Sequence, residues 1–373
     1  MQQVIYQKSE YAELKKLVSA HKAANICVVH TKGSYHSSGA EAFIKKLIGN
    51  DYAEFFDFEP NPKYEDLKKG LELINSGAFS LVIAIGGGTA IDIAKMMKAL
   101  ACKKCSLEHV IKGEEQITAS GIPLLAIPTT SGTGAEATQF SVMYIGKTKY
   151  SISSEFIYPE YVYLDPSFSI TAPPYLTACT GLDALSQATE ALWCVNATEE
   201  SNTYATEAIQ LACKNLPEAV DKNTQEAKAE MQTAAYLAGK AINITRTTAP
   251  HALSYAFTSY YGIPHGHAVA LSLPFFVEFN YAVTDADCMD KRGAGAVRQR
   301  IELFFKAFNT TGDNAKSDLL KFFSQIGIET SISRLIDKFD RSIIINNVNT
   351  QRLGNNPRKV SNETISQFIN NTI

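Results

Sequence analysis

Three of the seven histidines lie within residues 248–274: His251, His265 and His267. His251 begins a segment with a helical pattern, and His265 follows it in a turn that is rich in glycine and proline. Two histidines about four helical turns apart meet in space only if the turn between them is fixed. Glycine and proline are the residues that would fix it. The sequence therefore predicts that His251 and His265 share one site.

An aspartate and a glutamine stand four residues apart in a second segment, residues 181–187, which also has a helical pattern. Asp183 and Gln187 then lie on one face of that helix. An aspartate and two histidines that leave an open position suit a divalent metal that polarises a carbonyl group. Taken alone, Asp183 would be interpreted as a surface acid, and His251 and His265 as core or surface histidines. Together, and flanked by small apolar residues, they favour a metal site.

Three glycines follow an apolar strand, because residues 81–85 run directly into Gly86-Gly87-Gly88-Thr89 and from there into a helix. Such glycines let backbone N–H groups approach a phosphate, and the helix N-terminus adds its positive end. The spacing is not the G-x-G-x-x-G fingerprint, and a tight turn alone would need fewer glycines. We expect phosphate binding here. Three roles are open for Asp92: it is a solvated helix residue, it holds the loop in place, or it touches the cofactor.

A second loop, Thr129-Thr130-Ser131-Gly132-Thr133-Gly134, also follows an apolar strand. Small hydroxyl residues and glycines make a donor-rich loop that suits a ligand. The alternative is a surface turn, for which the absence of Asn, Asp and Pro is unusual. Both loops come at the carboxyl ends of strands, where open α/β sheets bind their ligands.

The elements that position these loops alternate between strand and helix up to about residue 170, as in an open α/β sheet. Residues 24–30 and 81–85 read as buried strands, with the polar stretch 30–39 as a turn after the first. After Pro174, helical patterns dominate, and the Asn-rich tail beyond Asn346 reads as a loop and one last helix. We predict an α/β nucleotide-binding domain over residues 1–170 and an all-α domain over residues 171–373.

Composition excludes several classes of function. The net charge of −3 gives no general attraction to polyanions, so nucleic acid is not an expected partner. The N-terminus has no apolar stretch of a signal peptide, and no apolar run is long enough for a membrane span. The seven cysteines, an odd number that includes a C-x-x-C at Cys102 and Cys105, predict reduced thiols and a cytoplasmic protein.

Four motifs carry a resemblance to a known family: residues 86–95 (GGGTAIDIAK), 128–136 (PTTSGTGAE), 181–185 (GLDAL) and 263–266 (IPHG). Over nearly its whole length the chain resembles the iron-containing (group III) alcohol dehydrogenases, which have the dehydroquinate synthase-like fold. The resemblance implies an NAD(P)-dependent oxidoreductase with a nucleotide-binding α/β domain and a helical domain. It also implies a cleft between the two domains that holds metal and substrate.

The usual metal ligands of this family are an aspartate, a histidine four residues later and two further histidines. Asp183, His251 and His265 match three of them, and Gln187 stands where the remaining histidine is usual. Tyr255 likewise replaces a family histidine four residues after His251. An amide oxygen binds hard cations but binds late metals less well than imidazole does. We therefore expect a divalent metal, iron or zinc, to be bound with altered affinity by Asp183, Gln187, His251 and His265.

Three further segments, residues 193–196, 241–255 and 355–358, resemble phosphonoacetaldehyde reductases, which make 2-hydroxyethylphosphonate in phosphonate biosynthesis. Arg246, five residues before His251, suits bidentate binding of a phosphonate or carboxylate. The alternative is a structural ion pair. Lys240, just before the second of these segments, and Arg358, in the third, are further basic residues that favour an anionic substrate. We expect a small anionic aldehyde or alcohol as substrate, held by Arg246.

The choice of cofactor depends on the end of the first predicted strand. NAD-specific relatives place an aspartate at the position of Thr31 to accept the ribose 2′-OH. Thr31 removes that charge and Lys32 adds a positive one, so we expect NADP(H) in preference to NAD(H). The cofactor-binding residues expected from the resemblance are Thr31, Asn61, Gly87, Gly88, Thr89, Asp92, Thr129, Thr130 and Lys149.

Four functions stay open at this point. The first is a reductase in which His267 relays a proton or is instead a solvent-facing turn residue. The second, a general short-chain alcohol dehydrogenase, differs from the first only in substrate. The third is a dehydroquinate synthase-like lyase, which regenerates its nucleotide, and the fourth is a non-catalytic metabolite-binding protein. Since the relatives are often dimers or larger, a homodimer is expected.

Overall fold

The computed structural model of the chain describes residues 2–101, 105–146 and 148–372. These residues form two compact units, one of Met1–Thr130 with Ala135–Thr171 and the other of Ser131–Gly134 with Ala172–Ile373. The chain thus changes unit at Thr171, and the short loop Ser131–Gly134 belongs with the second unit although strands of the first unit flank it.

The first unit is built on a parallel sheet whose strand order is β1-β8-β5-β4-β2-β3. Its strands are β1 (Gln3–Tyr6), β2 (Ile26–His30), β3 (Ala53–Phe55), β4 (Leu81–Gly86), β5 (Leu124–Pro128) and β8 (Tyr161–Leu164). Opposite partners in the register are His30 with Ile85 and Gly86 with Pro128. The carboxyl ends of β2, β4 and β5 therefore meet at one edge of the sheet.

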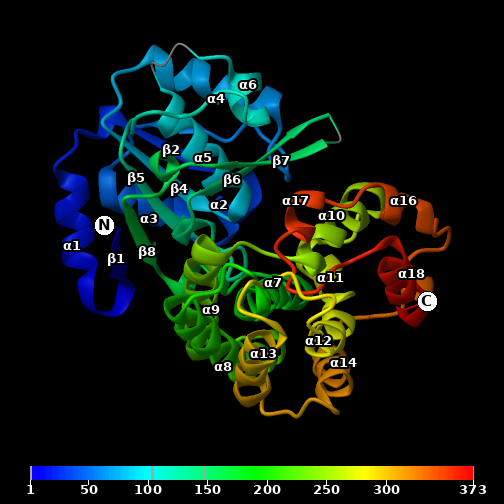
Figure 1. Cartoon of the computed structure of the whole chain (residues 1–373). Helices are drawn as coiled ribbons and strands as arrows, with labels where there is room; N and C mark the ends of the chain where they lie inside the picture. The colour runs from blue at the N-terminus through cyan, green and yellow to red at the C-terminus, as the bar shows by residue number, and fades with distance from the viewer. Residues whose placement is uncertain (1, 102–104, 147, 373) are drawn as a thin grey trace. The chain divides into compact units, whose positions relative to one another are not determined.

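Both faces of this sheet are buried, as its apolar strands predict. In β2, Cys27 and Val29 join a core shared with the helices of residues 64–112, whereas Ile26 and Val28 join a second core shared with the helices of residues 7–48. Figure 1 shows these strands surrounded by helices of the same unit. The helices are α1 (Gln7–Ser19), α2 (Lys32–Ser37), α3 (Ala40–Ile48), α4 (Tyr64–Ser76), α5 (Gly88–Leu100) and α6 (Leu107–Lys112). An antiparallel hairpin of β6 (Phe140–Ile145) and β7 (Thr148–Ser153) completes the unit.

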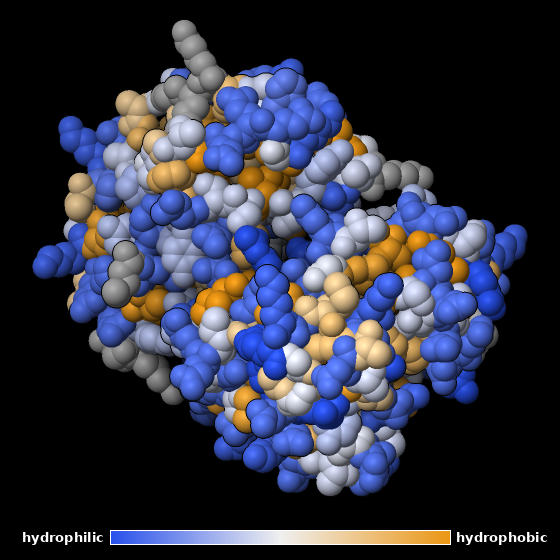
Figure 2. Space-filling view, viewed as in Figure 1, coloured by the Kyte–Doolittle hydropathy of each residue, from blue (hydrophilic) through white to orange (hydrophobic). Residues whose placement is uncertain are grey.

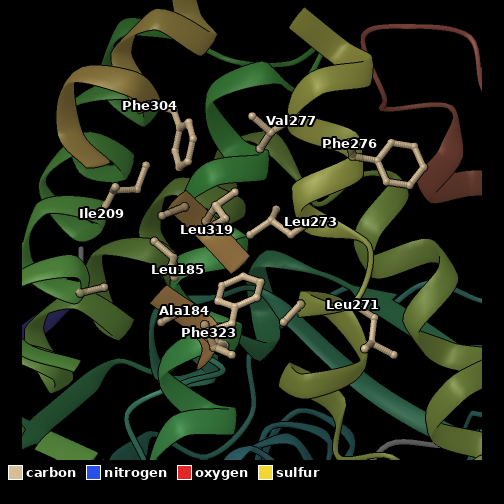
Figure 3. Close-up of a cluster of buried hydrophobic side chains, with 14 of the residues drawn as sticks. Ala184, Leu185, Ile209, Leu271, Leu273, Phe276, Val277, Phe304, Leu319 and Phe323 are labelled. Carbon is tan, nitrogen blue, oxygen red and sulfur yellow. The ribbon is translucent and has the colours of Figure 1, made fainter. Parts of the chain in front are cut away.

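The second unit is helical, and the part of it that the structure describes contains no β-strand. Figure 3 shows part of its core, which includes Leu185, Ile209, Phe276, Phe304 and Phe323 from five different helices. The predicted fold class, an α/β domain followed by an all-α domain, is confirmed. The helices are α7 (Pro174–Trp193), α8 (Glu199–Asp221), α9 (Gln225–Thr245), α10 (Ala249–Tyr261), α11 (His265–Ala270), α12 (Leu273–Tyr281), α13 (Ala294–Phe308), α14 (Ala315–Gln325), α15 (Ile332–Leu335), α16 (Arg341–Asn346), α17 (Thr350–Leu353) and α18 (Asn362–Thr372).

Two local predictions were incomplete. The polar stretch after β2, predicted as a turn, forms the short helix α2, because Tyr35 is buried there and stacks on His30 with 3.7 Å between the ring centroids. The edge strand β1 was not predicted, since its four residues show no clear burial pattern.

The surface features agree with the composition. Figure 2 shows hydrophilic residues over most of the viewed face, with hydrophobic residues in smaller patches. Among the described residues, no helix is both long enough and apolar enough to cross a bilayer. Cys27, Cys179, Cys194, Cys213 and Cys288 have free thiols, whereas Cys102 lies outside the described residues.

Candidate functional site

Helix α7 carries two buried carboxylates and a buried amide. Asp183, Gln187 and Glu190 follow one another at intervals of four and three residues, which places them on one face of the helix. All three side chains are buried. Polar groups this deep need partners, so this face must meet other polar groups of the unit.

The two histidines come from the consecutive helices α10 and α11. Gly262 ends α10 in the left-handed conformation (φ +72°), and the N–H of this cap bonds to carbonyls of the last turn of α10. Pro264 then stands before the first residue of α11, which is His265. A side chain at Gly266 would place its Cβ 1.9 Å from the carbonyl oxygen of Cys179 in α7. The glycine therefore lets α11 lie directly against the helix that carries Asp183.

The structure brings Asp183, His251 and His265 together, with one ligand atom of each within 4.8 Å of the others. Nε2 of His251 lies 3.2 Å from Oδ1 of Asp183, and the two imidazole centroids are 5.3 Å apart. Burial opposes the charged form of Asp183, but the His251 hydrogen bond and the His265 charge outweigh it and lower the pKa of this carboxyl. Burial likewise opposes the charged form of His251, but the neighbouring Glu190 and Asp183 raise the pKa of its imidazole.

Glu190 was not predicted from the sequence, yet it fixes the orientation of His251. Its Oε1 pairs with Nδ1 of His251, and its Oε2 accepts hydrogen bonds from the N–H and the hydroxyl of Thr248, at 2.6 and 2.8 Å. The indole N–H of Trp193 also donates to that hydroxyl, at 2.8 Å. A carboxylate at the far nitrogen of a histidine is the usual support of a metal-binding imidazole, because it leaves Nε2 free to bind the ion. The interval from Asp183 to Glu190 could have identified it.

The donor set fits a divalent metal. Oε1 of Gln187 is buried and accepts no hydrogen bond from any residue that the structure describes. Its Nε2 donates to the carbonyl of Thr133 at 3.3 Å, in the loop Ser131–Gly134. This loop approaches α7 closely, because a Cβ at Gly132 would lie 2.7 Å from Thr180. This amide oxygen lies one helical turn from Asp183, and a bound cation would satisfy it.

The basic residues expected at the substrate take different positions. Arg358 forms an ion pair with Asp287 at 2.6 Å, and Lys240 lies 3.9 Å above the ring of Tyr204. Arg246 instead caps the C-terminus of α9, just before α10, with a left-handed backbone (φ +75°). Non-glycine residues in this conformation are strained, and such strain is concentrated at functional sites.

His267, expected as a proton relay, has both ring nitrogens engaged. Nε2 lies 2.6 Å from the carbonyl oxygen of Glu329, so it must carry the proton and donate it. Nδ1 then accepts from the hydroxyl of Tyr175 at 2.9 Å. Burial lowers the pKa of this buried imidazole, which keeps it neutral.

In the first unit, the loops after β2, β4 and β5 converge at one edge of the sheet. The N–H of Thr129 donates to the carbonyl of Gly86 at 3.0 Å. A Cβ at Gly87 would lie 3.4 Å from the hydroxyl of Thr130, and one at Gly86 equally close to the hydroxyl of Thr31. The strand order reverses direction between β2 and β4, which is where open sheets bind nucleotides. The buried hydroxyl of Thr129 has no partner among the described residues, so it fits a ligand at this edge.

The other residues expected to bind the cofactor lie near this edge or in its neighbouring loops. Gly87 precedes α5 and Gly88 begins it, with Thr89 following in its first turn. The carboxylate of Asp92 accepts from the N–H of Val142 at 3.0 Å and so ties α5 to the β6–β7 hairpin. Desolvation raises the pKa of Asp92 to about 6, against the opposing charges of Lys95 and Lys149.

Asn61 lies apart from this arrangement in the sequence and is exposed. It has a left-handed backbone (φ +65°) and stands before Pro62, whose carbonyl accepts from the N–H of Tyr144 in β6. The turn is thus fixed against the hairpin, with the Asn61 side chain on the surface.

Two family models match the chain. Residues 2–166 match the model described as iron-containing alcohol dehydrogenase, and residues 177–373 match the C-terminal model of the Fe-containing alcohol dehydrogenase family. Together they cover both units of the structure.

Characterised proteins also match. The chain is 31% identical to a phosphonoacetaldehyde reductase of Streptomyces viridochromogenes, over 78% of this chain and 75% of that protein. It is 35% identical to long-chain-alcohol dehydrogenase 1 of Geobacillus thermodenitrificans, over 60% of this chain but only 58% of that protein's length.

Among solved structures, a sulfoacetaldehyde reductase from Bifidobacterium kashiwanohense in complex with NAD+ superposes with a TM-score of 0.88. The two are 26% identical, and the match covers 100% of this chain and 96% of that one. An iron-containing alcohol dehydrogenase from Thermotoga maritima superposes with a TM-score of 0.84 at 27% identity, over 100% of this chain and 97% of that one.

Proposed function

Because the chain belongs to the iron-containing alcohol dehydrogenase family, we propose that it reduces a short aldehyde with a nicotinamide cofactor, and that the aldehyde is phosphonoacetaldehyde. The observation that carries the choice of substrate is the position of Arg246, held in a strained conformation between α9 and the helix of His251. The relatives support it, since two of them are named for two-carbon aldehydes that end in a phosphonate or a sulfonate. The product would be 2-hydroxyethylphosphonate.

The proposed metal ligands are Asp183, Gln187, His251 and His265, with Glu190 holding the imidazole of His251. A divalent cation bound there, iron or zinc, supplies a Lewis acid that polarises the aldehyde oxygen. Glu190 has two functions in this proposal. It keeps Nε2 of His251 directed at the site, and it ties the start of α10, and with it the position of Arg246, to α7.

The proposed cofactor is NADP(H), which supplies the hydride. The residues of this chain that would bind it are Gly87, Gly88, Thr89, Thr129 and Thr130 at the phosphates, with Asp92 and Lys149 behind them and Asn61 at the surface. Thr31 and Lys32 would accommodate the 2′-phosphate, because neither carries a negative charge and Lys32 is exposed.

Arg246 would bind the anionic end of the substrate and orient its carbonyl carbon. The product oxygen would take its proton from water or through the hydroxyl of Tyr175, which is 48% exposed and bonded to His267. In this arrangement His267 contributes through the hydrogen bond that its Nδ1 accepts from Tyr175, because its Nε2 donates to the carbonyl of Glu329.

The test is NADPH oxidation by metal-reconstituted protein with phosphonoacetaldehyde and, in parallel, with propanal. Turnover of the phosphonate aldehyde at a kcat/KM well above that of propanal supports the proposal. A preference for propanal would make this a general short-chain alcohol dehydrogenase and Arg246 a structural residue. Turnover of a sugar phosphate without net loss of NADPH would instead identify a dehydroquinate synthase-like lyase. A homodimer and a cytoplasmic location remain predictions.

A further inference from the structure

We propose that Arg352 supplies a second guanidinium to the anion site of Arg246, and that the pair selects an aldehyde whose far end is a doubly charged tetrahedral oxyanion. The inference rests on the proposed function and extends it to a residue near the C-terminus, 106 positions from Arg246 in the sequence. Its substrate class is a phosphonate, in preference to a sulfonate, a carboxylate or a neutral chain.

The position of Arg352 links it to both Arg246 and the metal ligands. Its short helix, α17, packs against α10, as Figure 1 also shows. The guanidinium bonds to the hydroxyl of Thr247, the residue after Arg246, and lies 5.6 Å from the ring centroid of Tyr255. Tyr255 in turn stacks on His265, with centroids 6.0 Å apart and planes 28° apart. One aromatic ring thus separates Arg352 from a candidate metal ligand.

The charge around Arg352 differs from that around comparable arginines of the same unit. Arg300 and Arg358, which are also shielded from solvent, pair with Asp290 at 2.5 Å and with Asp287 at 2.6 Å. No carboxylate of a described residue lies within ion-pair distance of the Arg352 guanidinium. Burial and the charge of Arg352 both lower the pKa of Arg246. The two guanidiniums thus repel each other, and an anion bound by both would reduce that repulsion.

The segment that carries Arg352 is held in place by its own hydrogen bonds. The side chain of Asn349 accepts from the N–H of Arg352 at 3.0 Å. Nδ2 of Asn355 donates to the carbonyl of Thr247, also at 3.0 Å, and the carbonyl of Asn355 accepts from the N–H of Val195. The Asn-rich tail therefore fixes the guanidinium beside Thr247 before any substrate binds, which lowers the entropy lost on binding.

The chemistry of two guanidiniums explains the selectivity. Each presents a planar fork of N–H donors that pairs two oxygens of a phosphonate. A dianion interacts with both positive charges, whereas a sulfonate carries a single charge and an alkyl chain carries none. Tyr255 contributes a neutral ring between this site and His265, so it adds no competing charge.

The experiment compares Arg352→Met with the matched control Arg341→Met, which removes an exposed arginine from α16. We expect Arg352→Met to lower kcat/KM for phosphonoacetaldehyde about 10- to 100-fold, the usual worth of a charge-assisted contact. The kcat/KM for propanal should change less than about threefold, because propanal has no charged group for Arg352 to bind. Arg352→Lys keeps the positive charge but loses the planar fork of N–H donors. Its kcat/KM for phosphonoacetaldehyde should therefore lie between those of the wild type and Arg352→Met. The control should match the wild type with both aldehydes.

Equal losses with both aldehydes in Arg352→Met would overturn the inference, because they would show that Arg352 only supports Thr247 and Tyr255. A wild type that prefers propanal would instead overturn the proposed function itself, so the two failures are distinct. Binding of phosphonoacetate, measured by the shift in thermal unfolding, provides a readout independent of turnover. The shift should be present in the wild type and Arg341→Met and absent in Arg352→Met. An unchanged shift in Arg352→Met would contradict the inference.

Discussion

Glu190 holds Nδ1 of His251 from a position seven residues beyond Asp183 on the same helix. One face of α7 therefore supplies a candidate metal ligand, an amide oxygen to which no described residue donates, and the carboxylate that orients a second ligand. This arrangement concentrates the site on a buried helix, where side-chain positions are fixed by packing, and leaves only the two histidines to be brought in by α10 and α11.

Replacement of Glu190 by glutamine should weaken metal binding without removing a ligand. The amide has a single acceptor oxygen, so it cannot accept hydrogen bonds from both His251 and Thr248 as the two carboxylate oxygens do. The imidazole then loses its fixed orientation. We expect the affinity for zinc or iron to fall about 10- to 100-fold, as for other outer-shell partners of metal-binding histidines. Chelator competition measures it, and Glu207→Gln, on the exposed side of α8, is the control. An unchanged affinity would show that Glu190 serves only to hold Thr248.

Substitution of Gly266 by alanine should separate α11 from α7. The new Cβ would lie 1.9 Å from the Cys179 carbonyl oxygen, a backbone atom that cannot move aside. We expect a loss of about 1–3 kcal/mol in the free energy of unfolding, typical of overpacking, and a weaker metal site because His265 moves. Urea unfolding measures the first effect. Gly295→Ala in α13, where a Cβ has no neighbour within 4 Å, should be neutral or slightly stabilising.

Replacement of Thr31 by aspartate should reverse the proposed preference for NADPH. The carboxylate would repel the 2′-phosphate by between about 1 and 4 kcal/mol, depending on the local dielectric, and would accept from the ribose 2′-OH of NADH. We expect KM for NADPH to rise at least about tenfold and KM for NADH to fall. Ser37→Asp places the same charge on an exposed position of α2 and should change neither value. Equal shifts for both cofactors would place the 2′-phosphate elsewhere.

The parts of the fold that the sequence predicted are those with strong local patterns. The apolar runs of β2, β4 and β5 identify a sheet buried on both faces, and Gly86–Gly88 marks the turn into α5. Only one of the four residues of β1, Ile5, is buried, so no apolar run identifies this strand. Helix α2 was missed because its single buried residue, Tyr35, is stabilised by stacking on His30, a contact that no local pattern reveals.

The site divides in the same way. Asp183, His251 and His265 stand out by residue type, and the structure brings them together. Glu190 carries a local signal, its spacing from Asp183, that residue type alone did not make visible. Arg352 carries none, because only the packing of α17 against α10 brings it to Thr247. The assignment of Arg358 to the substrate could not be judged from the sequence either, since its partner Asp287 is 71 residues away.

Replacement of Lys228 by methionine should stabilise the protein at neutral pH. Lys228 is buried in α9, its described partner is the hydroxyl of Thr177, and burial lowers its pKa to about 8 from an ordinary 10.5. Between these pH values the unfolded chain binds a proton that the folded chain does not, so wild-type stability rises with pH across this window. We expect a gain of about 1 kcal/mol or more at pH 7 that shrinks as the pH approaches 10.

Urea unfolding at pH 7 and at pH 10 measures the Lys228→Met effect, with Lys214→Met on the exposed side of α8 as the control. A gain that is equal at both pH values would mean that the methionine improves packing and that the buried ammonium is not the cause.

Replacement of Gln187 by histidine tests whether position 187 faces the metal. The amide oxygen of Gln187 is a weak ligand for late metals, whereas imidazole binds them well. If Oε1 is directed at the ion, the histidine should raise the affinity for zinc about tenfold or more, equivalent to roughly 1.4 kcal/mol, with little effect on magnesium. Gln187→Leu, of similar size but without a donor atom, should lower the affinity for both ions. Competition with a zinc-sensitive chelator distinguishes these outcomes. If histidine and leucine gave the same zinc affinity as the wild type, Gln187 would serve only to hold the carbonyl of Thr133, and the metal would be bound by Asp183, His251 and His265 alone.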